Sequence, residues 1–536
     1  MSNSHDFPST ITLQPAVLPS GLVMSNGLVK AAMYEHMASL FGGSPNSNHI
    51  ALYKLWSQGG WGMIITGNVQ VSRDHLTLGR DMIIPSTISS DTVRAYRALA
   101  CAMRPASEQH LARDKDLSTP RTLVIMQVSH AGRQSPVVLG GRAPFVPPLA
   151  PSALGLGRGA PSGWFGRLAF KIGFPTPRTM NVQDIDYVVS RFVLSAKLAH
   201  DAGFDGIELH ASHGYLLAQF ISAKSNIRDD AYSAKRAPLH LLRRIVTSIR
   251  EVLPRPFVLG VKLNSSDYVG VGSAHDPRAE EEAEDRAVAQ VVDIAHWDMI
   301  DFIEISGGDY EDPAFLATSR QAFYSRFARK ARFAIHALTS SSPLPLVLLT
   351  GGMRSSATIQ NALTQGHADL VGVGRGSVLA PNLPLLLKEY YQRSRQRKDN
   401  HDGDDEDFID RGFPFQQPRL SYMKTSLIGV ATSILRSLGI LPLPSLIGAG
   451  ATTAWYIVAM RSISRDQKID HRTGTIRAVL LMWLPELRAS AMLLSCCVAC
   501  VLCICLSVVS FLRTIESYEV PTHSAPGLMT RTSHTT

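Results

Sequence analysis

An apolar strand and a polar loop meet in the stretch Gly206-Ile-Glu-Leu-His210-Ala-Ser-His213-Gly-Tyr215-Leu216. Its aliphatic first half predicts a short buried strand. Two histidines and a tyrosine follow directly, and side chains of these types bind small molecules and transfer protons to them. We therefore interpret the rest of the chain in three ways: as a scaffold that holds this stretch, as a binding site for a cofactor beside it, or as a tail that determines where in the cell it lies.

Short aliphatic runs recur along the chain, separated by enough residues to form helices. Two of the intervening stretches, 184–202 and 239–253, have the apolar periodicity of amphipathic helices. Strands that alternate with helices predict parallel strands in βα units. The simplest closure of eight such units is a (β/α)8 TIM barrel, which we place over residues 1–395. The eight runs cover residues 28–31, 62–66, 123–128, 206–209, 257–263, 302–305, 346–349 and 370–373.

The composition argues against several classes of protein. Of the 536 residues 45% are hydrophobic, and the net charge of +9 is spread over the whole length without a basic block. A nucleic-acid partner is therefore not expected. All cysteines except Cys101 crowd one apolar run at 496–505, which is no disulfide framework, so the barrel is expected to be a reduced, intracellular domain. The N-terminus shows no signal-peptide pattern.

A different composition begins after the barrel. Residues 396–420 contain a strongly acidic run and predict a charged linker. Residues 421–536 predict a hydrophobic, helical tail with two candidate membrane segments, 440–460 and 489–512. The first contains prolines and glycines, so a span, a re-entrant hairpin and an interfacial helix stay open. We expect membrane association with the barrel facing the cytosol, or a cytoplasmic protein if the tail does not insert.

Polar residues and glycines stand at the carboxyl ends of the expected strands, where barrel enzymes bind their ligands. Paired glycines near the last two strands leave backbone N–H groups accessible to a phosphate, in Thr350-Gly351-Gly352-Met353 and in Gly372-Val-Gly374-Arg375-Gly376. Arg375 would add charge-assisted hydrogen bonds. Ordinary turn glycines are the alternative, but two such motifs at two strand ends favour a phosphate.

A planar ring beside that phosphate would need an amide at its edge and a cation near its acceptor groups. Gln127 and Lys262, at the ends of the third and fifth strands, are placed to supply them. A cation there would stabilise negative charge on a reduced flavin ring. The long segment 134–177, rich in glycine and proline, predicts an excursion over the barrel mouth that shapes the substrate site.

The histidines of the opening stretch have two chemical interpretations. His210 and His213 can donate to one carbonyl or nitro oxygen, and Tyr215 can supply a proton to a neighbouring carbon. His-x-x-His can also bind a metal, but no further ligand is nearby, so no metal is predicted. Purely structural histidines at the barrel rim are a third possibility.

The motifs resemble the Old Yellow Enzyme family of FMN-dependent NADH:flavin oxidoreductases, or ene-reductases, over residues 10–390. The similar motifs are Leu28-Val-Lys-Ala-Ala-Met33, Gln127-Val-Ser-His-Ala-Gly-Arg133, the stretch from Ala202 to Leu216, Gln219-Phe-Ile-Ser222, Asn226, Ile305-Ser-Gly-Gly308, Thr350-Gly-Gly352 and Ala368-Asp-Leu-Val-Gly-Val-Gly-Arg375.

The resemblance implies a (β/α)8 barrel with FMN as cofactor and NADH or NADPH as reductant. His210 and His213 would hold the oxygen of an enone-like substrate. A hydride would pass from flavin N5 to the β-carbon of an activated C=C bond, and Tyr215 would donate the proton. The implied FMN-binding residues are Ala31, Ala32, Met33, Tyr34, Asn68, Gln127, Lys262, Gly351, Gly352, Gly374 and Arg375.

One departure from the family pattern lies at the flavin itself. Tyr34 stands where members usually have Thr, Ser or Cys near flavin O4, and a side chain of that size would be bulky there. Two alternatives to ene-reduction therefore remain. The same flavin site can run as a dehydrogenase or as an NAD(P)H oxidase, and a barrel without turnover can serve as a membrane-tethered interaction protein.

Overall fold

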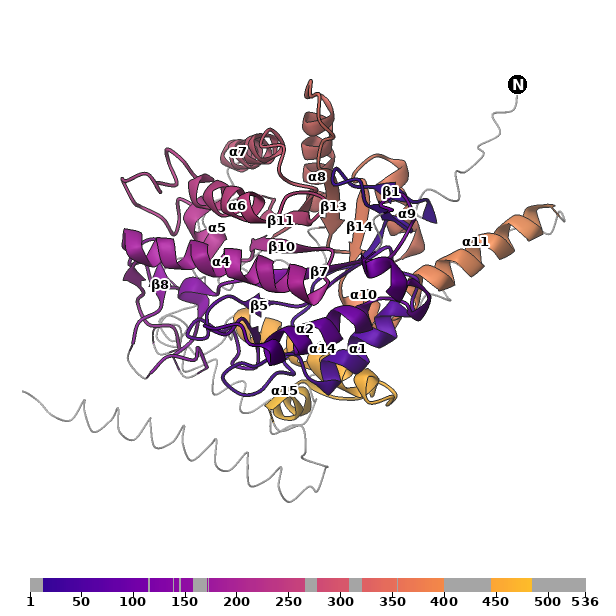
Figure 1. The fold of residues 1–536 in the computed structure, drawn as a ribbon, viewed down its shortest axis with the longest axis horizontal. Coiled ribbons are helices and arrows are strands. Elements are labelled where there is room, and N and C mark those ends of the chain that lie inside the picture. The colour runs from indigo at the N-terminus through magenta and orange to yellow at the C-terminus, as the bar shows by residue number, and fades with distance from the viewer. Residues whose placement is uncertain are drawn as a thin grey trace, which may run out of the picture. The chain divides into compact units, whose positions relative to one another are not determined.

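The computed structural model describes residues 13–113, 116–137, 139–143, 146–157, 171, 173–265, 277–307, 321–353, 355–399 and 445–483 (Figure 1). The chain divides into two compact units, Met1–Met482 and Trp483–Thr536. Apart from Trp483, the second unit lies outside the described residues.

A closed barrel of parallel strands forms the centre of this unit, as the eight aliphatic runs predict. Neighbouring strands pair in the order β3-β4-β7-β10-β11-β12-β13-β14, and β14 pairs back with β3. Their side chains are almost all buried, because helices cover the outside and side chains fill the inside. The strands are β3 (Leu28–Lys30), β4 (Met63–Ile65), β7 (Leu123–Ser129), β10 (Gly206–Ala211), β11 (Val258–Asn264), β12 (Phe302–Ser306), β13 (Leu346–Thr350) and β14 (Leu370–Val373).

A hairpin closes the amino-terminal end of the barrel. Its strands β1 (Ala16–Val17) and β2 (Val23–Met24) pair antiparallel. Leu18, Leu22 and Met24 of this hairpin join one hydrophobic cluster with residues of the barrel strands, among them Val258 and Phe302. With that end filled by apolar side chains, a ligand can enter only at the opposite, carboxyl end of the strands.

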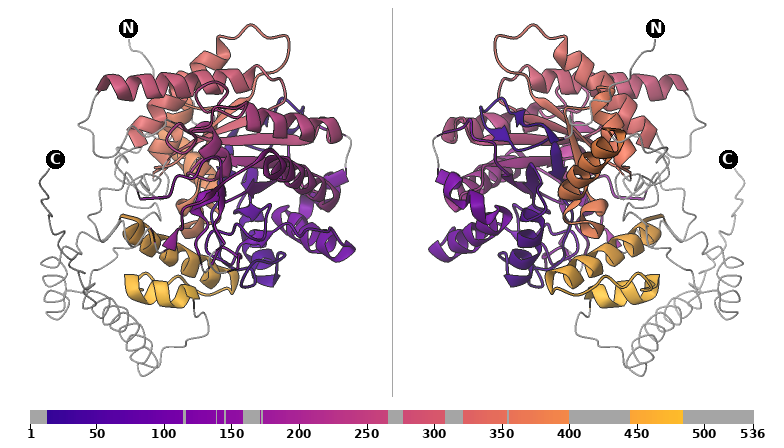
Figure 2. Two further views of the ribbon diagram at one scale, coloured as in Figure 1. Left: turned by 90° about the vertical axis from the view of Figure 1, so that its left-hand side faces the viewer. Right: turned by 90° about the vertical axis from the view of Figure 1, so that its right-hand side faces the viewer.

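The helices cover the barrel on its outside (Figures 1 and 2). Asn181 caps α4 through a reciprocal pair of hydrogen bonds with Asp184, and Gly203 ends it in the left-handed conformation at φ 87°. The helices before the linker are α1 (Ser47–Ser57), α2 (Ser90–Met103), α4 (Val182–Ala202), α5 (Leu216–Ile221), α6 (His240–Val252), α7 (Pro277–Ala295), α8 (Gln321–His336), α9 (Ser356–Thr364), α10 (Arg375–Leu379) and α11 (Leu383–Asp399).

Shorter elements extend the barrel mouth. Strands β5 (Val69–Gln70) and β6 (Met82–Ile83) prolong the sheet beyond β7. The excursion 134–177, described only in part, is preceded by the 3-10 turn η3 (Gly132–Gln134). It contains β8 (Leu149–Ala150), which pairs with β9 (Arg178–Thr179) just after it. A second 3-10 segment, η2 (Ala106–Arg113), follows α2.

Two helices of the predicted hydrophobic tail belong to the same compact unit as the barrel. α14 (Ser445–Ser464) packs against α1 and α10, and α15 (Thr475–Trp483) lies beside it (Figure 2). Trp455 and Ile457 of α14 are fully or almost fully buried there, as are Ala454 and Met460. In the described part of 440–460, these apolar side chains pack on the barrel, and a membrane span there is not supported.

Among the described residues, no helix combines the length and the apolarity that crossing a membrane would need. The second candidate segment, 489–512, and most of the charged linker lie outside the described residues.

Candidate active site

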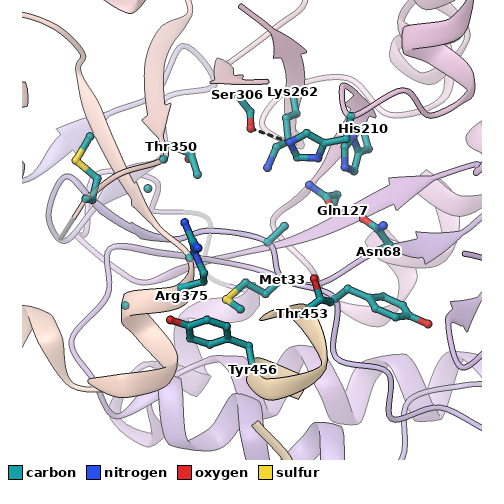
Figure 3. A pocket seen from close by; sticks show the side chains of 18 of the residues that line it. Met33, Asn68, Gln127, His210, Lys262, Ser306, Thr350, Arg375, Thr453 and Tyr456 are labelled. Carbon is teal, nitrogen blue, oxygen red and sulfur yellow. Dashed lines mark hydrogen bonds between the residues drawn. The ribbon is translucent and has the colours of Figure 1, made fainter. Parts of the chain in front are cut away.

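The loop after β10 is a tight turn that directs three functional side chains to one place. His213 and Gly214 both adopt left-handed backbone conformations, at φ 56° and 71°. Such strain at a residue other than glycine is costly and is concentrated at functional sites. The backbone N–H of Tyr215 closes the turn on the carbonyl of Ser212 at 3.2 Å. As a result His210, His213 and Tyr215 all line one cavity at the barrel mouth (Figure 3).

His210 is a neutral hydrogen-bond donor. Burial lowers its pKa well below 6.5, and the nearby His213 and Lys262 lower it further, so the ring stays uncharged near neutral pH. Its Nδ1 accepts a hydrogen bond from the backbone N–H of Ser212 at 3.3 Å. The proton of the neutral ring must then be on Nε2, which leaves that nitrogen as a donor.

His213 is neutral as well but already has a polar neighbour. Burial lowers its pKa well below 6.5, with a further contribution from Lys262. Its Nε2 lies 2.9 Å from Oγ of Ser306, the bond drawn in Figure 3. The two imidazoles lie edge to face, with centroids 5.0 Å apart. The structure therefore brings the expected pair together and adds Ser306, which the sequence shows only as part of a motif.

Tyr215 lies edge to face on His210, with ring centroids 4.7 Å apart. Nδ2 of Asn68 donates a hydrogen bond to its phenol oxygen at 3.3 Å. Because the amide uses an oxygen lone pair, the hydroxyl keeps its own proton for donation. Asn68, expected among the cofactor-binding residues, thus also positions the expected proton donor.

Two buried acids hold the amide and the cation at the floor of the cavity. Gln127 Nε2 donates to Glu208 Oε2 at 2.6 Å, and Lys262 Nζ lies 2.6 Å from Glu304 Oε1. Burial, followed by the charge and hydrogen bond of Glu304, raises the pKa of Glu208 well above its usual value. Burial opposes ionisation of Glu304 as well, but Lys262 and its hydrogen bonds bring the pKa of Glu304 below its usual value. The opposite directions of these shifts favour Glu304 as the carboxylate and Glu208 as the protonated acid.

The glycines after β13 and β14 form an open backbone cradle beside Arg375. Gly351 and Gly352 adopt φ values of 117° and 69°, which residues with a side chain rarely adopt. A Cβ at Gly372 would lie 2.1 Å from Thr350 Oγ1, so no larger residue fits. Gly351, Gly352, Gly374 and Arg375 all line the cavity. Accessible N–H groups and a guanidinium are the donors that bind a phosphate.

Tyr34 lines the cavity, but its hydroxyl is turned into a buried network. It donates to Asp81 Oδ2 at 3.1 Å and lies 3.1 Å from His36 Nδ1. Burial, together with the charge of Asp81, raises the pKa of Tyr34 well above 10, so the phenol stays neutral. Gln70 and Thr77 also donate to Asp81. The bulky side chain that the sequence shows at this position thus has its hydroxyl bonded within a buried polar cluster.

All but one of the residues expected at the site line this cavity. The exception is Ala31, which is fully buried behind it. No group of acids, histidines and cysteines among the described residues could hold a metal ion. Ser306, Thr350, Met353, Gly372 and Gly376, which the sequence shows within motifs, line the cavity as well. Lining residues that no motif of the sequence covers are Tyr324, Leu379, Thr453, Tyr456 and Met460.

These residues fit a bound FMN. The glycine cradle and Arg375 can hold its phosphate, and Lys262 and Gln127 can face the polar edge of its ring system. The neutral imidazoles and the phenol of Tyr215 line the same cavity. An anion-binding end and a ring-binding end thus occur in one pocket.

The sequence model of the NADH:flavin oxidoreductase / NADH oxidase family matches residues 20–394. The chain belongs to this family. Members are FMN-dependent NAD(P)H oxidoreductases, and the chain is assigned to that enzyme class with FMN as cofactor. The resemblance that the sequence motifs indicate is confirmed.

Similar proteins occur in fungi and in bacteria. The NADH-dependent flavin oxidoreductase iliE of Neonectria sp. (strain DH2) is 38% identical over 391 residues, which are 70% of this chain and 46% of that protein. The NADH-dependent flavin oxidoreductase iliE of Hypocrea jecorina (strain QM6a) is 34% identical over 379 residues, 70% of this chain and 88% of that protein. The chain therefore spans less than half of the first protein and most of the second.

Solved structures of the same fold are more distant in sequence. The Old Yellow Enzyme homologue from Zymomonas mobilis has a TM-score of 0.52 at 20% identity and covers 71% of this chain and 92% of its own. Morphinone reductase has a TM-score of 0.52 at 19% identity, with 71% and 89% covered. At this identity the likeness concerns the fold alone.

Proposed function

We propose that this protein uses NADH to reduce an activated C=C bond, such as that of an α,β-unsaturated carbonyl compound, on bound FMN. The observation that carries the proposal is one cavity lined by His210, His213, Tyr215 and Lys262 and by the glycine cradle. NADH is preferred in this proposal over NADPH because relatives at 34% and 38% identity are described as NADH-dependent.

The imidazoles bind and polarise the acceptor. His210 offers its Nε2 proton to the carbonyl oxygen, and His213 offers a second donor once the oxygen displaces Ser306 from Nε2. Both rings are neutral, so they act as dipoles rather than as acids. Two such donors in a buried site stabilise the negative charge that develops on the oxygen during reduction.

Tyr215 completes the reaction by donating its phenolic proton to the carbon next to the carbonyl group. The hydrogen bond from Asn68 would stabilise the phenolate that remains. FMN, when bound, supplies the two-electron transfer between the nucleotide and the acceptor. The positive charge of Lys262 favours negative charge on the ring system. Glu304, which is paired with Lys262, partly cancels this effect.

Oxygen as the acceptor is the second candidate. The NADH oxidase of Thermoanaerobacter brockii is 28% identical over 69% of this chain. An oxidase needs the cofactor site but neither the histidine pair nor Tyr215. The presence of all three in one cavity therefore favours the reductase.

Consumption of NADH by the full-length protein with added FMN tests the proposal. We expect rapid anaerobic consumption that depends on 2-cyclohexen-1-one and yields cyclohexanone in equal amount. Consumption that requires oxygen and ignores the enone would identify an oxidase. Absence of flavin binding and of NADH consumption in a correctly folded chain would leave the non-catalytic alternative.

A further inference from the structure

Helix α14 contributes to the cofactor cavity from outside the part of the chain that matches the family. The match ends at residue 394, whereas α14 begins at Ser445. Thr453, Tyr456 and Met460 line the cavity, and the spacing of three and four residues places them on one face of the helix. In Figure 3 the helix approaches from the side opposite His210 and Lys262.

We propose that α14 is part of the FMN site and that Tyr456, together with Arg375, holds the phosphate end of the cofactor. This inference rests on the proposed binding of FMN and adds a residue that no family motif covers. The hydroxyl of Tyr456 would donate to a phosphate oxygen beside the guanidinium. The helix would thus retain the cofactor as well as complete the wall of the cavity.

The surroundings of Arg375 support this assignment. Arg375 lies at the start of α10, which packs against α14, and Tyr456 lies beside it in Figure 3. Burial lowers the pKa of Arg375, and Tyr456 acts in the opposite direction, which agrees with the two side chains lying close together. Among the described residues, no carboxylate pairs with this cation. A half-buried guanidinium without a carboxylate is suited to an anionic ligand.

Tyr456 is held rigidly enough to select a ligand. Only 4% of its surface is exposed, and its ring lies edge to face on Trp455 with centroids 5.0 Å apart. Trp455 is itself buried and approaches His471, at 5.9 Å between centroids. A phenol fixed in this way loses little conformational entropy when it binds a phosphate.

Arg461 anchors the helix to the loop that lines the cavity. Its guanidinium donates to the carbonyl of His36 at 2.6 Å and to the carbonyls of Leu481 and Met482 at 3.0 and 2.7 Å. His36 follows Met33 and Tyr34, both of which line the cavity. One buried side chain therefore joins α14, α15 and the loop after β3. We therefore expect the position of Tyr456 to depend on the hydrogen bonds of Arg461.

A comparison of FMN with riboflavin, which lacks the phosphate, tests the proposal. Apoprotein of the full chain is titrated with each flavin, and binding is followed by quenching of flavin fluorescence. For Tyr456→Phe we expect the FMN dissociation constant to rise roughly ten- to a hundredfold, the usual loss for a hydrogen bond to a charged group. The riboflavin dissociation constant should stay within about twofold of the wild-type value, because riboflavin has no phosphate to which Tyr456 could donate a hydrogen bond.

Two further variants separate this role from a loss of fold. Ser462 lies on α14 but does not line the cavity, so Ser462→Ala should change neither the FMN nor the riboflavin dissociation constant. Arg461→Gln removes the guanidinium hydrogen bonds that hold α14 against α15 and the loop after β3, so it should weaken the binding of both flavins. An unchanged FMN constant in Tyr456→Phe, or equal losses for FMN and riboflavin, would overturn the proposal. If the wild-type chain binds neither flavin, the proposed function fails with it.

Discussion

Replacement of Tyr215 by Phe separates the two halves of the proposed reaction. The substitution removes one hydroxyl and leaves the ring, which is 7% exposed and packs on His210. Asn68 Nδ2 loses the acceptor it has at 3.3 Å, which should cost about 1 kcal/mol of folding free energy. Loss of the proton donor should slow reduction of the enone roughly 10²- to 10⁴-fold. Reduction of FMN by NADH needs no proton from Tyr215 and should be unchanged.

Anaerobic stopped-flow measurement of the two half-reactions, each followed by flavin absorbance, checks this prediction. Tyr232→Phe is a matched control: its hydroxyl is also buried and bonded, to Arg244 at 2.7 Å, but it does not line the cavity. That variant should leave both half-reactions intact. Equal slowing of both half-reactions in Tyr215→Phe, or no slowing of enone reduction, would refute the assigned role.

Three further predictions follow from the buried charges and the histidine pair. Burial lowers the pKa of Lys30 to about 7. Between pH 7 and 10 the unfolded chain therefore keeps a proton on this lysine that the folded chain has lost. The free energy of unfolding should rise over this range by up to about 1.4 kcal/mol per pH unit. Lys30→Met should flatten that rise in urea unfolding, and an unchanged slope would contradict it. Glu304→Gln leaves Lys262 buried without its partner and should destabilise the fold by about 3–5 kcal/mol, whereas adding Lys262→Met should recover part of the loss; a single variant as stable as wild type would argue against the pair. Replacing both His210 and His213 by Leu, which cannot donate a hydrogen bond, should abolish the charge-transfer band that bound phenols give with the flavin, and persistence of the band would exclude them as the oxygen-binding pair.

Much of the barrel could be predicted from local pattern. Each strand is a short aliphatic run between turn residues, and eight such runs leave one simple closed arrangement. Because all carboxyl ends of parallel strands meet at one rim, residues as distant in sequence as Asn68 and Tyr215 were expected together. They lie within hydrogen-bonding distance.

Other features depend on packing that no local pattern shows. Glu208 and Glu304 are single acids within apolar strands, which is a visible signal, but the opposite shifts of their pKa values follow only from their proximity in the barrel. The hydroxyl of Tyr34 is directed by Asp81, 47 residues away in sequence.

The apolar stretch of α14 has the composition of a membrane segment as well as that of a buried helix. Hydropathy alone could not distinguish a membrane segment from a buried helix, because apolar side chains are favourable both in lipid and in a protein interior. In the structure, residues 445–464 form a helix that contacts α1 and α10.

In the proposed reaction, electrons pass from NADH through bound FMN to an activated C=C bond. To follow this path directly, the full-length, FMN-loaded protein is reduced with one equivalent of NADH without oxygen and then mixed with 2-cyclohexen-1-one. We expect the oxidised flavin spectrum to return and one equivalent of cyclohexanone to form. A flavin that stays reduced in the enone and is reoxidised only when oxygen is admitted would contradict it.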